Sequence, residues 1–343
     1  MEDAFKVDVL GTFDEPWAMA VLPRGNNIVI TEKPGHLKHW NGTKVETTIA
    51  LPRIDMGGQG GLGDVVLAPD FEESGMIYLS WVEAGEHGTR GAVVARGQVG
   101  KDGLAWQRPE IIWRQSPKVT GRGHFSHRMV FSPDGKYLFV ASGERQKFTP
   151  AQDLSNNLGK VLRLNLDGTP AAGNPFAGKG GTSAEIWSYG HRNILGLQFD
   201  AEGRLWALEH GPAGGDELNL IKPGKNYGWP LVSDGDNYDG SKIPRHATRP
   251  DLAGPAISWN PVIAPGDFIF YSGKMWPEWK GQALIAALGT EGLVRVRIDG
   301  EKGVEEARYL LGKRIREIRE APDGSLYVLE DGKGGRLLRL SRK

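Results

Sequence analysis

The chain has 343 residues, and its 42 Lys and Arg are balanced by 42 Asp and Glu. It contains no cysteine, which excludes disulfides, thiolate catalysis and thiolate metal sites. A formal net charge of zero gives no attraction to nucleic acid or an anionic membrane, and no apolar stretch is long enough for membrane insertion.

A pattern of short apolar strands and turns recurs along the chain at a spacing of roughly 40–60 residues, which is typical of propeller blades. The six instances lie at residues 16–40, 64–81, 128–164, 197–208, 268–298 and 318–340. The 49 glycines and 21 prolines also favour many strands joined by turns. An open sandwich with coincidental repeats is the alternative. The repetition predicts an all-β fold, a single six-bladed β-propeller domain over residues 1–343 with four-stranded antiparallel blades, and no helix is clearly signalled.

The first two candidate site motifs precede the second and third repeats. Residues 57–64 read Gly-Gly-Gln-Gly-Gly-Leu-Gly-Asp, with Gln59 in the middle, and taken alone this is a flexible turn. His124 enters the third repeat and Glu144 leaves the same pair of strands. A His and a carboxylate on one hairpin can form an oriented general base, whereas a lone His is more often structural.

The segment from Tyr189 to Pro230 is the most informative part of the chain. It places a cation, an amide, a carboxylate pair and two glycine-rich turns around one predicted strand, residues 205–208. Glycine lets the backbone approach a ligand closely, and proline fixes the direction of the carbonyl before it. The segment therefore predicts a binding site built from loop carbonyls and side chains at one end of a sheet.

Two arginines near the C-terminus complete the set of motifs. Arg314 and Arg316 are two residues apart in a predicted strand, so their side chains point to the same face. Such a pair is usually solvated, but at a channel mouth it suits a dianionic ligand.

Taken together, these motifs resemble the soluble quinoprotein sugar dehydrogenases, the glucose/sorbosone dehydrogenases, and in particular the aldose sugar dehydrogenase branch. The shared order is Gly-Gln-Gly-Gly, Gly-His, Gly-His-Arg-Asn, His-Gly-Pro with Gly-Asp-Glu-Leu-Asn, Asn-Tyr-Gly-Trp-Pro and Arg-Ile-Arg, between Pro16 and Leu340. The resemblance implies a six-bladed propeller that binds pyrroloquinoline quinone (PQQ) and Ca²⁺. It implies oxidation of aldose sugars at the anomeric carbon to lactones, by hydride transfer to PQQ, with electrons passed to an external acceptor. From the family we also expect a monomer that is periplasmic or secreted, although no signal peptide is visible in this chain.

The resemblance also assigns roles to residues. His124 would be the general base, Glu144 would hold its imidazole, and Arg192 would donate to the quinone carbonyl oxygen. The backbone carbonyls of Gly211 and Pro212 would hold Ca²⁺, which favours oxygen ligands. The residues expected to bind the cofactor are Gln59, His124, Arg192, Asn193, Arg314 and Arg316.

Two positions depart from the family pattern. Gly289 stands where relatives carry a cofactor-contacting Lys, and His127 stands where they often have Gly. Two other classes of function stay open at this point: a calcium-dependent propeller lactonase or hydrolase, and a non-catalytic binding propeller.

Overall fold

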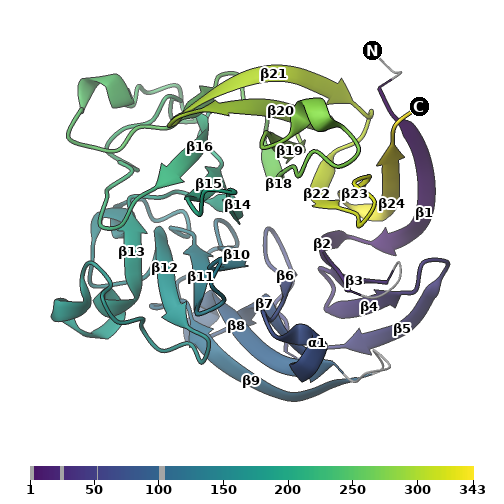
Figure 1. The fold of residues 1–343 in the computed structure, drawn as a ribbon. Helices are drawn as coiled ribbons and strands as arrows, with labels where there is room; N and C mark the ends of the chain where they lie inside the picture. Colours follow the sequence, from purple (N-terminus) through teal and green to yellow (C-terminus); the bar gives the residue numbers. More distant parts are fainter. Residues whose placement is uncertain (1–3, 24–26, 52, 100–104) are drawn as a thin grey trace.

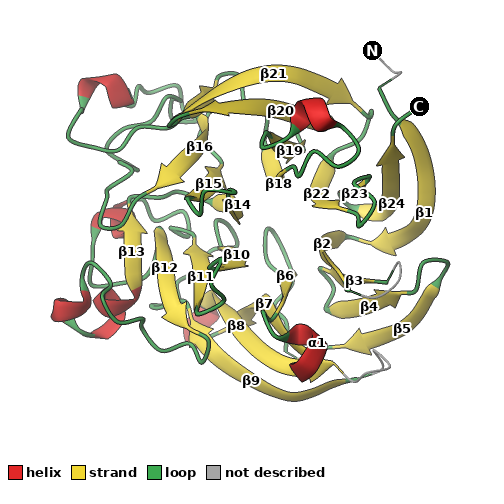
Figure 2. Ribbon diagram, viewed as in Figure 1, coloured by secondary structure: helices red, strands yellow, loops and turns green. Residues whose placement is uncertain are grey.

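The structure is a computed structural model that describes residues 4–23, 27–51, 53–99 and 105–343. Six four-stranded antiparallel sheets form a closed ring, as Figure 1 shows, and Figure 2 shows how little helix accompanies them. The predicted six-bladed β-propeller is therefore confirmed. No helix in the described part of the chain is long and apolar enough to cross a membrane.

Each blade is named here by its place along the chain, and its strands run from the central axis outward. Blade 1 comprises β2 (Pro16–Val21), β3 (Ile28–Glu32), β4 (His36–Trp40) and β5 (Val45–Ala50). Blade 2 comprises β6 (Leu62–Leu67), β7 (Met76–Ala84), β8 (Arg90–Val99) and β9 (Trp106–Arg114), with the short helix α1 (Phe71–Ser74) between β6 and β7. Blade 3 comprises β10 (Ser126–Phe131), β11 (Tyr137–Ser142), β12 (Lys160–Asn165) and β13 (Ile186–Tyr189).

The second half of the ring repeats this arrangement. Blade 4 comprises β14 (Ile194–Phe199), β15 (Leu205–Glu209), β16 (Asp216–Ile221) and β17 (Ile257–Trp259). Blade 5 comprises β18 (Pro265–Phe270), β19 (Ala283–Ala287), β20 (Gly292–Asp299) and β21 (Lys302–Leu310). Blade 6 comprises β22 (Ile315–Glu320), β23 (Leu326–Glu330), β24 (Lys333–Ser341) and, as its outer strand, β1 (Lys6–Asp14).

The pairing of β1 with β24 closes the ring, and the repeat pattern had not indicated it. Val7 lies opposite Leu340 and Val9 opposite Leu338 in this antiparallel pair. One blade is thus shared between the two ends of the chain, so the last blade is completed by hydrogen bonds to the first strand.

The hydrophobic core is divided among the interfaces between neighbouring blades. Between blades 6 and 1, for example, Tyr327 and Leu329 pack with Met19 and Ile30, all of them buried. A strand that packs against neighbouring blades on both faces is buried along its whole length, and its sequence is therefore largely a continuous apolar run. β3, β15, β19 and β23 are buried at every residue in this way.

One buried arginine occupies the axis of the ring. Arg128, from the inner strand of blade 3, forms ion pairs with Asp64 at 3.2 Å and Glu317 at 2.8 Å. Its guanidinium also donates to the carbonyls of Leu195 and Gly266 and lies 4.0 Å from the Trp17 ring centroid. Including its own strand, Arg128 thereby joins the inner edges of all six blades, which fixes the frame around which the loops are arranged.

Candidate active site

The predicted site residues lie in or beside the connections at one mouth of the ring. In an antiparallel blade, the link from the outer strand to the next inner strand and the link between the second and third strands emerge on the same side. Gln59, His124, Arg192, Asn193 and Arg314 lie in links of the first kind, whereas Glu144, Gly211 and Pro212 lie in links of the second kind. Arg316 is in β22, and Arg314 immediately precedes that strand rather than lying in it, which corrects the expectation that both belong to one strand.

His124 and Glu144 are in direct contact. The His124 Nδ1 atom is hydrogen-bonded to Glu144 Oε1, and both side chains are buried. The other carboxylate oxygen, Oε2, accepts hydrogen bonds of 2.6 Å from the backbone N–H groups of Lys147 and Phe148. On the opposite side, the His124 N–H donates to Gln59 Oε1 at 2.7 Å. His124 is therefore held both through its imidazole ring and through its backbone.

The electrostatics favour a neutral His124. Burial lowers the pKa of His124, and the charges of Arg192 and Arg145 lower it further, against the opposing influence of Glu144. Burial alone would raise the pKa of Glu144, but the hydrogen bond and charge of His124, the Phe148 N–H and the charge of Arg192 together lower it. Because an ionised Glu144 can only accept, Nδ1 carries the imidazole proton and Nε2 keeps its lone pair. The pair has the protonation state of a general base.

Arg192 has an unused donor in a buried position. Its Nη1 donates to the His210 carbonyl at 3.1 Å and its Nη2 donates to the Tyr238 hydroxyl at 3.3 Å. Its buried Nε has no hydrogen-bond partner among the described residues. Since a buried unpaired N–H is costly, this atom marks a place for a ligand acceptor. The Trp229 ring centroid is 5.1 Å from the guanidinium carbon; the sequence interpretation included Trp229 in a motif but gave it no role. The exposed Tyr238 is a site residue that the sequence interpretation missed.

A buried polar relay holds the backbone at Arg192. The His191 ring is hydrogen-bonded to Ser188 Oγ at 2.8 Å and to Glu209 Oε1 at 3.0 Å, and Glu209 Oε2 accepts the Arg192 N–H at 2.8 Å. Ser188, His191 and Glu209 are all buried, so this Ser–His–Glu chain is placed to support the site. Asn193, also buried, accepts a hydrogen bond from Ser126 Oγ at 3.2 Å on its side-chain oxygen.

Gly211 and Pro212 form a tight turn with free carbonyl oxygens. Neither oxygen accepts a hydrogen bond from a described residue, although both residues are buried. The turn is held by Asp216, whose Oδ1 accepts from Gly211 N at 2.9 Å and whose Oδ2 accepts from Ile263 N and Ala264 N. A β-carbon at Gly211 would lie 2.2 Å from the Gly214 carbonyl oxygen, so glycine is required here. Two fixed, unpaired carbonyls suit a hard cation such as Ca²⁺.

Arg314 and Arg316 point to the same carboxylate. Their Nε atoms donate to the two oxygens of Asp331, at 3.1 and 2.9 Å. The Arg316 side chain is 13% exposed, whereas that of Arg314 is 51% exposed. Burial lowers the pKa of His210 to about 3, and Arg192 and Arg316 contribute to the lowering. His210 Nε2 lies 2.6 Å from the Pro265 carbonyl oxygen, and the His210 carbonyl accepts a hydrogen bond from Arg192 Nη1.

The two positions that depart from the family pattern are both constrained by packing. A β-carbon at Gly289 would lie 2.9 Å from the Ile263 carbonyl oxygen, which leaves little room for the lysine of relatives. His127 is stacked on Trp17, with ring centroids 5.1 Å apart, and its Nδ1 is 2.8 Å from Ser80 Oγ. A β-carbon at Gly63 would collide with its ring. His127 therefore packs from blade 3 against residues of blades 1 and 2.

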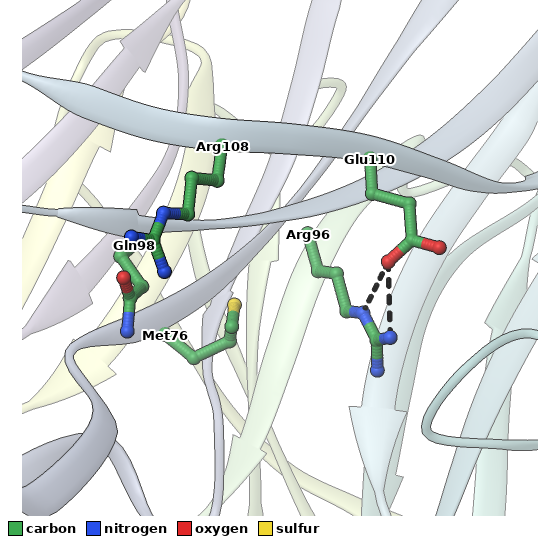
Figure 3. A pocket seen from close by; sticks show the side chains of 5 residues that line it. All are labelled: Met76, Arg96, Gln98, Arg108 and Glu110. Carbon is green, nitrogen blue, oxygen red and sulfur yellow. Dashed lines mark hydrogen bonds and ion pairs between the residues drawn. The ribbon is translucent and has the colours of Figure 1, made fainter.

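The structure also has a cavity away from the mouth of the ring. It has a volume of about 360 Å³ and lies on the outer strands of blade 2, lined by Met76, Arg96, Gln98, Arg108 and Glu110. Figure 3 shows the Arg96–Glu110 ion pair, with an Nη2–Oε2 distance of 3.0 Å, across one side of it. None of the predicted site residues lines this cavity, so it contributes nothing to the chemistry at the mouth of the ring.

The class of protein defined by the fold is a six-bladed β-propeller with a polar site in the loops at one mouth. The glucose/sorbosone dehydrogenase family model matches residues 13–339, and the chain belongs to this family.

Individual relatives extend this result. The aldose sugar dehydrogenase YliI of Escherichia coli K12 is 42% identical over 96% of this chain and 90% of its own length. The apo crystal structure of the E. coli aldose sugar dehydrogenase is 39% identical and has a TM-score of 0.92, covering 99% of this chain and 100% of that chain. The PQQ-bound aldose sugar dehydrogenase of Streptomyces coelicolor is 27% identical and has a TM-score of 0.80, with 99% and 98% covered.

Proposed function

We propose that this protein is a PQQ- and calcium-dependent aldose sugar dehydrogenase. It oxidises the anomeric carbon of an aldose to a lactone and passes the electrons to an external acceptor. The observation that carries the proposal is the buried His124–Glu144 pair, with His124 Nε2 free, at the same mouth as the unpaired Arg192 Nε. The PQQ-bound relative supports the choice of cofactor.

The donors at the mouth fit PQQ, an anionic quinone. Arg316, Arg314 and Arg192 supply positive charge for its carboxylates and carbonyl oxygens, with Gln59 and Asn193 as neutral partners. The free carbonyls of Gly211 and Pro212 would hold Ca²⁺ beside it. PQQ supplies, when bound, a quinone carbonyl carbon that accepts hydride, and Ca²⁺ supplies Lewis-acid polarisation.

The protein's own residues would then manage the proton. His124 Nε2 takes the proton from the anomeric hydroxyl, which leaves the imidazole positively charged. Glu144, fixed by the N–H groups of Lys147 and Phe148, stabilises that imidazolium and keeps the ring in one orientation. Arg192 directs its free N–H toward the oxygen on which negative charge develops.

The direct test is titration of PQQ into the purified protein with and without Ca²⁺, followed by reduction of a dye on addition of glucose or another aldose. We expect tight, calcium-dependent binding and sugar-dependent dye reduction. Absence of PQQ binding under both conditions would overturn the proposal and leave the hydrolase and binding-propeller functions. A periplasmic or secreted location and a monomeric state are part of the same proposal, and fractionation and sedimentation test them.

A further inference from the structure

Arg145, the residue after Glu144, has a buried charge without a carboxylate partner. Its side chain is fully buried, and the described part of the chain forms no ion pair with it. Its three nitrogens donate instead to backbone carbonyls: Nε to Gly123 at 2.9 Å, Nη1 to Arg90 at 2.6 Å and Nη2 to Gly121 at 2.7 Å. A cation buried among neutral acceptors is costly, and burial accordingly lowers the pKa of Arg145 to about 10.

The carbonyls that Arg145 binds belong mostly to the loop that ends in His124. Gly121 and Gly123 flank Arg122, and the backbone N–H of Arg145 also donates to the His124 carbonyl at 3.2 Å. The guanidinium carbon lies 3.8 Å from the centroid of Phe125, the next residue. Arg145 thus contacts the segment on both sides of His124, while Glu144 binds the ring itself.

The backbone on both sides of this contact is in an unusual conformation. His124 has φ of 51° and Arg145 has φ of 64°, a left-handed region that non-glycine residues adopt at a cost. Such conformations persist only where the surroundings determine them, and the guanidinium hydrogen bonds to Gly121 and Gly123 provide that constraint for the His124 loop.

We propose that Arg145 is a positioning residue for His124: its guanidinium fixes the Gly121–His124 loop and thereby the orientation of the imidazole. This inference rests on the proposed function, in which His124 is the base. The charged groups whose influence reaches His124 are Glu144, Arg192 and Arg145, and the nearby His210 is kept neutral by burial. Of the two cations, Arg145 is the one whose hydrogen bonds all go to backbone.

Two substitutions separate the geometric effect from the electrostatic one. Arg145→Lys keeps the charge but loses the planar fork, whereas Arg145→Met loses both. Arg163 is a matched control, because it also stacks on aromatic rings in blade 3 and donates to Asn174 and the Ala172 carbonyl. Arg163→Lys and Arg163→Met report the general effect of losing such an arginine on folding.

Three readouts apply to each folded variant. Hydrogen exchange of the peptide covering residues 120–126 and the NMR titration of ¹⁵N-labelled His124 are measured without cofactor, and kcat and KM with PQQ, Ca²⁺ and sugar. We expect both Arg145 variants to exchange faster at residues 120–126 and to lose about 10- to 100-fold in kcat, as misplaced groups do. We expect only Arg145→Met to raise the His124 pKa, which moves the acid limb of kcat/KM to higher pH. Added guanidinium ion should partly restore kcat in that variant.

Exchange, titration and kcat that match wild type in both variants would overturn the inference, as would equal effects from the Arg163 controls. If the wild-type protein oxidises no sugar, the proposed function fails, but the exchange and titration measurements still decide whether Arg145 positions His124.

Discussion

The His124 imidazole and the Glu144 carboxylate contribute differently to the site. Three hydrogen bonds, from the imidazole and two backbone N–H groups, fix the Glu144 carboxylate. Among the described residues, none forms a hydrogen bond with His124 Nε2. A carboxylate held in this way orients the ring and balances its charge without itself competing for the substrate proton.

Replacing His124 by Ala should therefore reduce turnover by about 10²–10⁴, the usual contribution of a general base, with PQQ still bound. The measurement is steady-state dye reduction together with a PQQ titration. His87→Asn, on an exposed loop, is the control and should retain full activity. Wild-type turnover in the His124 variant would remove this residue from the mechanism.

The two arginines that share Asp331 should contribute unequally to cofactor binding. Arg316→Ala should weaken PQQ by about 1.5–3 kcal/mol, typical of hydrogen bonds to charged groups. Arg314→Ala should cost less, because the Arg314 side chain is half exposed and solvent screens its charge. Calorimetric titration of PQQ into both variants checks the order, and a larger loss from Arg314 would contradict it.

The sequence indicated the donors of the site better than the groups that hold them. Gln59, His124 and Arg192 belong to motifs shared with a known family. Asp331 is different: it follows β23, and the pairing of β22 with β23, extended by the hydrogen bond of 2.8 Å from the Asp331 N–H to the Arg314 carbonyl, places it opposite the arginines. Such partners depend on strand pairing across the blade, which the local sequence pattern does not encode.

At the scale of elements, the connection between β16 and β17, residues 222–256, is distinguished by its length of 35 residues. β16 ends away from the mouth of the ring, yet the connection returns to it. There Asp236 pairs with Ala213 through two backbone hydrogen bonds of 2.9 and 3.0 Å, and Tyr238 reaches Arg192. The Asn-Tyr-Gly-Trp-Pro motif marks the start of this connection in the sequence, but residues 233–249 carried no readable code, because their ordered path comes from contacts with the rest of the fold.

His246 anchors this connection in a pH-dependent manner. Its Nδ1 lies 3.6 Å from both Glu217 and Asp234. Although burial opposes it, these acidic partners raise the pKa of His246 to about 9. Since the folded pKa lies above the ordinary value of about 6.5, the stabilisation is complete below pH 6.5 and is lost as the pH rises through 9.

We therefore expect the thermal unfolding temperature to fall between pH 6.5 and 9 in the wild type and to fall less in His246→Gln. Scanning calorimetry at several pH values measures both slopes. Parallel slopes would show that His246 does not carry this dependence. Limited proteolysis within residues 222–256 should increase over the same pH interval in the wild-type protein.

The outer strands were the elements least visible in the sequence. β21 alternates exposed and half-buried residues along its whole length, and β1 carries exposed Val7 and Val9. The inner strands, by contrast, are apolar and repeat six times. The blade count could thus be predicted from buried strands alone, whereas the membership of β1 in blade 6 depends on closure of the ring.

At the scale of the whole molecule, Arg128 connects the blades through charge as well as packing. Its carboxylate partner Glu317 also pairs with Arg319 at 2.7 Å, and burial raises the pKa of Glu317 to about 8 despite both arginines. Removing one member of such a buried cluster leaves the charges of the other members buried without an opposite charge beside them.

Arg128→Ala should accordingly lower the free energy of unfolding by about 3–5 kcal/mol. Arg297→Ala, which removes a half-exposed ion pair with Glu306 on the outside of blade 5, should cost less than about 1 kcal/mol. Denaturant unfolding of both variants gives the comparison. Equal losses would mean that the axial cluster contributes no more than a surface pair.

The β1–β24 pairing means that the ring has no obligatory starting point. Because Lys6 lies opposite Ser341, a short linker can join the two ends, and the chain can then be opened at an exposed turn such as Asp134–Gly135, on the face away from the active site. A circular permutant of this kind retains every strand pair and moves the shared blade from blade 6 to blade 3. The protein can therefore be fused to other proteins or electrodes at such turns on the far face, with the mouth that holds His124 left unobstructed.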